Sequence, residues 1–187
     1  MKRLILIVFL FLVGCSFHKL PPLREYTLNL KPIAFKLDRK VRKTIVVSDV
    51  DCGAPFDSTF IFFKKGKFEF DRYGNVRWIK PVCLMYKTSI EHVLNKTHLF
   101  VSGDILRPNY RLSYVIYDFE PLFLANRTYA ICNIEFRLKD ENNGKIYIHA
   151  FSKSIKINGN SFDDVISSLN DLFNLSLSDL INWIEKI

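Results

Sequence analysis

Cys15 is the residue whose surroundings most clearly predict a chemical reaction. It follows a basic start, Lys2 and Arg3, and an unbroken run of ten apolar residues over 4–13. This run is shorter than the roughly 20 residues that a bilayer-crossing helix needs, but it suits the core of a secretory signal. An apolar residue, then Gly14, then Cys15 forms the pattern of a bacterial lipobox, in which the cysteine sulfur receives a diacylglyceryl group before cleavage. We therefore expect Cys15 to be lipidated.

Lipidation of Cys15 predicts how the chain is divided. Residues 1–14 are the lipoprotein signal peptide to be removed, 15–22 the lipidated tether, and 23–187 a single periplasmic α+β domain. A diacylglyceryl and an N-acyl lipid on Cys15 would anchor the protein to a membrane without spanning it. The residue after the cysteine is Ser16 rather than Asp, which favours the periplasmic face of the outer membrane over the inner membrane. An uncleaved membrane anchor and an ordinary signal peptide are the alternatives.

The rest of the chain offers little that predicts catalysis. It contains no glycine-rich phosphate loop, no G-x-S-x-G elbow and no His or Cys pair at zinc-binding spacing. We therefore expect no catalytic residue, no metal, no cofactor other than the lipid on Cys15, and no enzymatic activity. Asp118 and Glu120 are the nearest candidates for a pair of catalytic carboxylates, and ion pairing at a strand end is the alternative that we favour.

Three further cysteines leave the redox chemistry open. Cys52 and Cys83 are candidates for a disulfide in an oxidising periplasm, linking the loop after the second strand to the first helix. Three free thiols are the alternative. Cys132 falls on the apolar side of a predicted strand, which indicates a small hydrophobic core residue.

The net charge of +8 does not by itself identify a partner. Basic chains often bind nucleic acid, but an exported lipoprotein meets none, so we expect no nucleic-acid partner. Anionic lipid and acidic proteins remain as classes of partner that the charge would attract, and a solvated loop that only keeps the protein soluble is the alternative that we favour.

Periodicity predicts one α+β domain with a single mixed or antiparallel sheet. A mid-chain helix should begin at Pro81, and a long C-terminal helix should run from about Phe162 and pack on the sheet. The segments whose apolar residues alternate, or whose β-branched and aromatic residues cluster, are expected to be strands: 26–30, 44–50, 60–63, 67–73, 110–120, 127–139 and 145–157.

The apolar stripe of the C-terminal helix is wider than one sheet face requires. Four residues widen it or lie opposite it: Val165, Leu172, Leu175 and Trp183. One explanation is a deep groove in the same domain. The other is an interface with a partner or with further copies of the chain in a homo-oligomer.

Several short motifs follow one another in a recognisable order. They are Cys15, the segment 22–28 (PLREYTL), Ile45-Val46-Val47 with Val50, the aromatic strand 60–63 (FIFF), Tyr73 with Trp78 and Pro81, Phe119-Glu120, and the long terminal helix. In this order the chain resembles the ABC-type transport auxiliary lipoproteins, the outer-membrane lipoprotein subunits of MCE-type and paraquat-inducible lipid transport systems. It departs from that pattern at Cys52-Gly53 and in its heavily basic stretch 36–43.

The resemblance implies a non-enzymatic function. It predicts a lipid-anchored auxiliary subunit that helps an ABC/MCE-type system move lipids between the inner and outer membranes, with the transporter subunits as partners. The family has no established catalytic residues to carry over. Two alternatives stay open: an outer-membrane assembly lipoprotein that supports lipopolysaccharide or barrel-protein insertion, and an envelope enzyme with dispersed catalytic residues.

Overall fold

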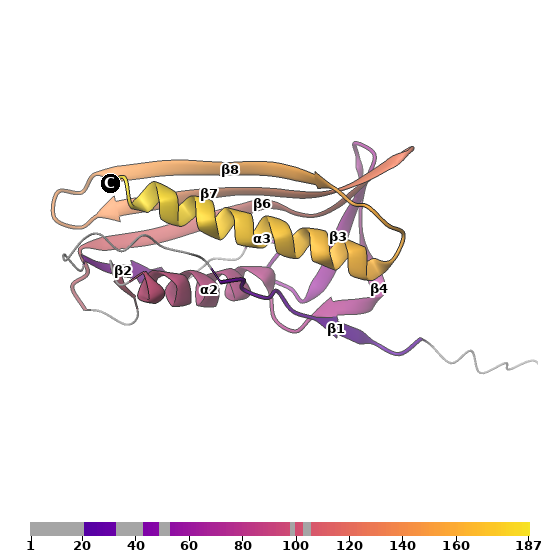
Figure 1. Ribbon diagram of the computed structural model, residues 1–187, viewed down its shortest axis with the longest axis horizontal. Helices are drawn as coiled ribbons and strands as arrows, with labels where there is room; N and C mark the ends of the chain where they lie inside the picture. Colours follow the sequence, from indigo (N-terminus) through magenta and orange to yellow (C-terminus); the bar gives the residue numbers. More distant parts are fainter. Residues whose placement is uncertain (1–20, 33–42, 49–52, 98–99, 103–105) are drawn as a thin grey trace, which may run out of the picture.

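One mixed sheet with two helices makes up the described part of the protein. A computed structural model describes residues 21–32, 43–48, 53–97, 100–102 and 106–187. The helices are α2 (Val82–Lys96) and α3 (Phe162–Ile184). The strands are β1 (Arg24–Tyr26), β2 (Lys43–Val47), β3 (Phe60–Lys65), β4 (Glu69–Trp78), β5 (Phe100–Ser102), β6 (Tyr110–Leu124), β7 (Arg127–Asp140) and β8 (Ile146–Lys156). The predicted α+β class, with both helices packed on the sheet, is confirmed (Figure 1).

The long strand β6 organises the sheet. Along one edge it pairs antiparallel with β7, which in turn pairs with β8. Its other edge is shared: β2 pairs parallel to its beginning at Tyr110–Leu112, and β3 pairs parallel to its end at Leu122–Phe123. β5 continues the sheet beyond β2, and β4 and β1 continue it beyond β3. A β-bulge between Ile116 and Asp118 shifts the register within β6.

The core lies between the sheet and the two helices, which run side by side across one face (Figure 1). Tyr86 of α2 is fully buried, and its ring meets that of Phe173 of α3 with the centroids 4.8 Å apart. Below them, Tyr114 of β6 donates a hydrogen bond to the carbonyl oxygen of Cys83 at 2.6 Å. Alternate residues of β7 bury their side chains against this layer: Ala130, Cys132, Ile134, Phe136 and Leu138.

Local sequence signals account for most element ends. At the start of α3, Ser161 Oγ accepts from the Asp164 N–H, and the Asp164 carboxylate accepts from the Ser161 N–H, a capping box. Pro81, the predicted first residue of the mid-chain helix, occupies the N-cap of α2, so the helix begins one residue later, at Val82. Gly66 and Gly144 have φ of +64° and +73° in the β3–β4 and β7–β8 turns, a conformation that side chains with a Cβ disfavour.

The first predicted strand is shorter than the alternation over 26–30 indicates. β1 ends at Tyr26, and residues 27–32, here called the strap, run along α3 instead of joining the sheet. The backbone N–H groups of Asn29 and Lys31 are bonded to side chains of α3, so they are not available to a neighbouring strand. The second strand begins at Lys43 and ends at Val47, and its predicted end at Val50 lies outside the described residues.

Candidate functional site

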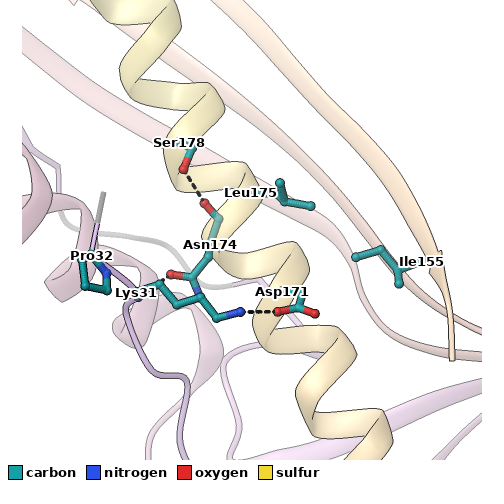
Figure 2. A pocket seen from close by; sticks show the side chains of 7 residues that line it. All are labelled: Lys31, Pro32, Ile155, Asp171, Asn174, Leu175 and Ser178. Carbon is teal, nitrogen blue, oxygen red and sulfur yellow. Dashed lines mark hydrogen bonds and ion pairs between the residues drawn. The ribbon is translucent and has the colours of Figure 1, made fainter. Parts of the chain in front are cut away.

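A shallow hollow lies over the middle of α3, and we call it the α3 groove. It has a volume of about 390 Å³, with the strap on one side of the helix and the Ile155 side chain of β8 on the other (Figure 2). Seven residues line it: Lys31, Pro32, Ile155, Asp171, Asn174, Leu175 and Ser178.

Asn174 holds the strap against α3. Its Oδ1 accepts from the Lys31 N–H at 2.7 Å, and its Nδ2 donates to the Asn29 carbonyl oxygen at 2.9 Å. One helical turn earlier, Asn170 Oδ1 accepts from the Asn29 N–H at 2.7 Å. These two amide side chains satisfy the strap backbone as a neighbouring strand would. The end of the strap is thereby fixed to the helix across more than 140 residues of sequence.

The α3 groove combines an apolar centre with a polar rim. Leu175 is 42% exposed at its centre and points toward Ile155 (Figure 2). The Lys31 ammonium forms an ion pair with Asp171 at 2.6 Å, both side chains being largely exposed. Such a surface pair contributes little to stability but gives the apolar groove a polar rim. An apolar side chain of a partner, with a polar group beside it, matches this surface.

A second cluster lies under the bulge of β6 and joins four strands. The Lys64 ammonium of β3 binds the Asp118 carboxylate and lies 2.9 Å from Glu120 Oε1. Asn133 of β7 donates to Asp118, and Ser152 of β8 donates to Asn133 Oδ1 at 2.5 Å. The expected ion pairing of the two carboxylates is therefore confirmed, although it occurs within β6 and not at its end.

The Lys64 ammonium pairs with both carboxylates of this cluster, and the pKa values of Asp118 and Glu120 shift in opposite directions. Burial of Glu120, whose side chain is 1% exposed, raises its pKa to about 7, despite the hydrogen bonds from Lys64 and from the Phe119 N–H. Burial also opposes ionisation of Asp118, but the bonds from Lys64 and Asn133 outweigh it and hold the pKa of Asp118 below its ordinary value. Burial disfavours the charge on Lys64 too, yet its two carboxylate partners raise its pKa.

The raised pKa of Glu120 predicts how stability depends on pH. Between pH 4.5 and about 7 the folded protein holds a proton that the unfolded chain has released, so stability falls as pH rises through this window. We expect Glu120→Gln to flatten this decline and to be more stable than the wild type by about 2 kcal/mol at pH 8, but not at pH 4.5. Urea unfolding at pH 4.5, 6 and 8 measures this difference.

Glu135→Gln is the matched control, because Glu135 lies on the next strand and pairs with Arg137 at the surface. It should leave the slope of stability against pH as in the wild type. Parallel curves for the wild type and Glu120→Gln would show that Glu120 is ionised throughout this range and would contradict the assignment.

The cysteines fall into two groups. Cys15 and Cys52 lie outside the described residues, so lipidation and the Cys52–Cys83 pairing stay predictions; Cys83 itself is disulfide-bonded. Cys132 is fully buried in the core as predicted, with the Tyr86 hydroxyl 3.7 Å from its sulfur. Burial raises the pKa of the Cys132 thiol to about 12, which keeps it protonated and unreactive.

Of the histidines that the structure describes, His149 packs against α3 and His92 lies on the surface. His149 Nε2 lies 2.6 Å from Asp179 Oδ2, and its ring stacks on that of Trp183 with the centroids 5.1 Å apart. His92 is exposed on α2. Among the residues whose placement is described, no three His, Cys, Asp or Glu side chains gather closely enough to hold a metal ion.

The four residues proposed for an interface separate into two pairs. Val165 and Leu172 are 7% and 0% exposed within the chain itself, so they belong to the core and cannot meet a partner. Leu175 is exposed, and Trp183 is partly buried beside His149. Packing within the same domain thus explains Val165 and Leu172. An interface remains a hypothesis for Leu175 and Trp183.

Sequence reasoning missed the strap contacts of Asn170 and Asn174. The available signal was two asparagines four residues apart in the middle of an apolar helix, where amide side chains have no local advantage. Neither α2 nor α3, the helices of the described ranges, combines the length and apolar character needed to cross a bilayer.

Comparison with known proteins informs the fold. No family model and no curated protein match the chain. Protein XCC0632 from Xanthomonas campestris, assigned to the family DUF330, is 15% identical; the match covers 86% of this chain and 93% of that one, with a TM-score of 0.78. A second solved structure, of an uncharacterised protein, is 12% identical over 88% of this chain and 99% of that one, with a TM-score of 0.67. At these identities the similarity establishes that the chain shares the fold of these two proteins.

Proposed function

We propose that the protein is a non-catalytic, lipid-anchored auxiliary subunit of an ABC/MCE-type transport system that moves lipids between the inner and outer membranes. The observation that carries the proposal is the strap. It follows β1, the first strand after the tether, and lies against α3 next to the exposed Leu175 of the α3 groove. Only one short strand thus separates the membrane tether from the segment that borders the docking surface, an arrangement suited to a subunit that holds a partner at a fixed place near a bilayer.

The remaining support comes from the sequence and from the chemistry of the clusters. The lipobox at Cys15 and the order of motifs along the chain favour an outer-membrane lipoprotein of this class. The most conspicuous ionisable cluster, Lys64 with Asp118 and Glu120, is an ion-paired network between two neighbouring strands. Its role in the proposal is therefore to fasten β3 to β6, and transport chemistry is left to the partner subunits.

Site-specific crosslinking in intact cell envelopes tests the proposal. A photoreactive phenylalanine analogue at position 175 should capture an inner-membrane component of an ABC/MCE-type system, with the protein itself in the outer-membrane fraction. Leu84 of α2 is the matched control, because its exposed fraction of 43% equals that of Leu175 within one per cent while it lies outside the groove.

Each result has a distinct meaning. Capture of a transport component from position 175 but not from 84 supports the proposal, and additional crosslinks between copies would add a homo-oligomer. Capture of a barrel protein instead would replace the proposal with the assembly-lipoprotein alternative. Equal capture from both positions, or capture from neither, would contradict a docking function of the groove.

A further inference from the structure

Two β-turns lie side by side at one end of the sheet. The β3–β4 turn covers residues 66–68, and the β6–β7 turn covers residues 125–126. They are adjacent because β3 and β6 pair in parallel immediately before them, and the Gly66 N–H donates to the Phe123 carbonyl oxygen at 2.9 Å (Figure 1). We call this end the basic tip, after five exposed residues that it carries: Lys65, Lys67, Phe68, Leu124 and Arg127.

Phe68 is the most unusual of these residues. Its exposed fraction is 96%, so the ring has almost no contact with its own protein. Leu124, on the neighbouring turn, is 44% exposed, and Phe70 is 43% exposed while stacking on Phe62. A large apolar side chain that stays exposed at the apex of a turn contributes no burial free energy to folding. Several such side chains together mark a surface that contacts an apolar phase or a partner.

The charges around Phe68 are predominantly positive. Lys65, Lys67 and Arg127 are exposed on the two turns, against one acidic side chain, Glu69, which lies 3.6 Å from the Lys65 ammonium. The next acidic group, Asp71, accepts a bond from the backbone N–H of Arg72. An apolar ring surrounded by basic side chains is the composition of segments that sit at the boundary between headgroups and acyl chains of anionic bilayers.

The lipid anchor is able to bring this tip to a membrane. β1 enters at the same end of the molecule as the two turns (Figure 1). Arg24 pairs with Val76, seven residues along β4 from Glu69, which at about 3.3 Å per residue places it roughly 23 Å from the tip. Nine residues separate Arg24 from Cys15, and a chain of that length reaches about 30 Å when extended. An anchor at Cys15 and the basic tip can therefore contact one bilayer together.

We propose that the basic tip is a second membrane contact, in which the Phe68 ring enters the headgroup boundary of the anchoring bilayer while Lys65, Lys67 and Arg127 bind anionic lipid phosphates. The orientation, though not the chemistry of the tip, rests on the proposed lipid anchoring. Two contacts fix how the domain faces the membrane, whereas a flexible tether alone lets it rotate. The α3 groove would then present a constant direction to partner subunits.

The test uses the lipidated full protein reconstituted in vesicles of phosphatidylethanolamine and phosphatidylglycerol (3:1), part of whose acyl chains are brominated to quench tryptophan. Phe68→Trp places a reporter at the tip. Leu106→Trp is the matched control: Leu106 is also 96% exposed, but it precedes the other end of β6, about 50 Å away along the strand. The wild-type protein gives the emission of Trp78 and Trp183, which both variants share.

We expect the added emission of F68W to be quenched at least twofold more than that of L106W. Vesicles of phosphatidylcholine alone, or the substitutions K65Q, K67Q and R127Q made together in F68W, should reduce this excess by at least half, because each basic residue near an anionic surface contributes about a fivefold factor in binding. If the excess quenching of F68W is undiminished in both cases, Phe68 inserts into the bilayer without help from the basic residues. That result would overturn the role assigned to Lys65, Lys67 and Arg127.

Flotation of the vesicles tests the lipid anchor separately from the membrane contact of the basic tip. A protein that floats with the vesicles but shows equal quenching at positions 68 and 106 overturns the tip contact and leaves the anchored subunit intact. A protein that fails to float contradicts the lipid anchor, and with F68W unquenched it contradicts both. Excess quenching of F68W in floating protein supports both.

Discussion

The Cys15→Ser protein is expected to carry no acyl chain and to accumulate as a precursor that keeps residues 1–14. Lipid transfer to the cysteine sulfur precedes cleavage at a lipobox, so a serine at this position blocks both steps. Acyl chains contribute about 0.8 kcal/mol for each buried CH₂ group, and several chains are what make anchoring stable. Loss of the sulfur should therefore abolish anchoring by acyl chains and leave the uncleaved apolar run 4–13 as the remaining membrane attachment of the precursor. Incorporation of labelled fatty acid and the mass of the isolated protein measure the result.

Ser16→Ala is the control for Cys15→Ser, since it changes the adjacent residue and keeps the sulfur. It should be acylated and processed as the wild type is. Acyl label retained in Cys15→Ser, or processing of this variant to the mature length, would contradict lipidation at Cys15. Either outcome would also remove the anchor on which the proposed function depends.

Asn174→Ala is expected to release the strap from α3. The substitution leaves the Lys31 N–H and the Asn29 carbonyl oxygen without their partners, and Asn174 is only 7% exposed. Because Asn29 and Lys31 are themselves exposed, water can partly replace the lost partners, and we expect a loss of about 1.5 kcal/mol in the free energy of unfolding. Urea denaturation measures this loss, and amide hydrogen exchange at Asn29 and Lys31 should show local opening of the strap.

Ser178→Ala provides the comparison one turn further along α3. Its hydroxyl donates to the Asn174 carbonyl oxygen at 3.0 Å, a bond within the helix that does not involve the strap. We expect this variant to unfold within about 0.5 kcal/mol of the wild type. If Asn174→Ala behaves like Ser178→Ala and keeps the strap amides protected, the strap is not held by Asn174, and the role assigned to Asn174 in shaping the α3 groove fails.

Release of the strap should also affect partner capture. Asn174 fixes the strap, which forms one side of the α3 groove beside Leu175. Asn174→Ala combined with the photoreactive analogue at position 175 should therefore yield less crosslinked partner than the analogue alone. The acylation of Cys15 should be unchanged, since this reaction depends on the amino-terminal motif.

Local patterns predicted the elements well where neighbouring residues determine them. Alternation along β7 predicted that Cys132 lies in the core, and the apolar stripe that begins near Phe162 predicted α3. Each of these features depends on residues within a few positions of one another, so the sequence carries the whole signal. The interface hypothesis was wrong for Leu172, because the width of a helical stripe does not show how deeply the helix is buried.

By itself, the sequence determined the α+β class, the two helices, most of the strands and the lipobox on which the predicted anchor depends. Tertiary structure alone decided that residues 27–32 follow α3 instead of a strand, and that Lys64 joins Asp118 and Glu120. It also brought the two turns of the basic tip together. The physical reason is that these contacts join groups 54 to 145 residues apart. The packing of the sheet determines which of these groups meet. The periodicity and spacing of the residues around each group do not indicate its partner.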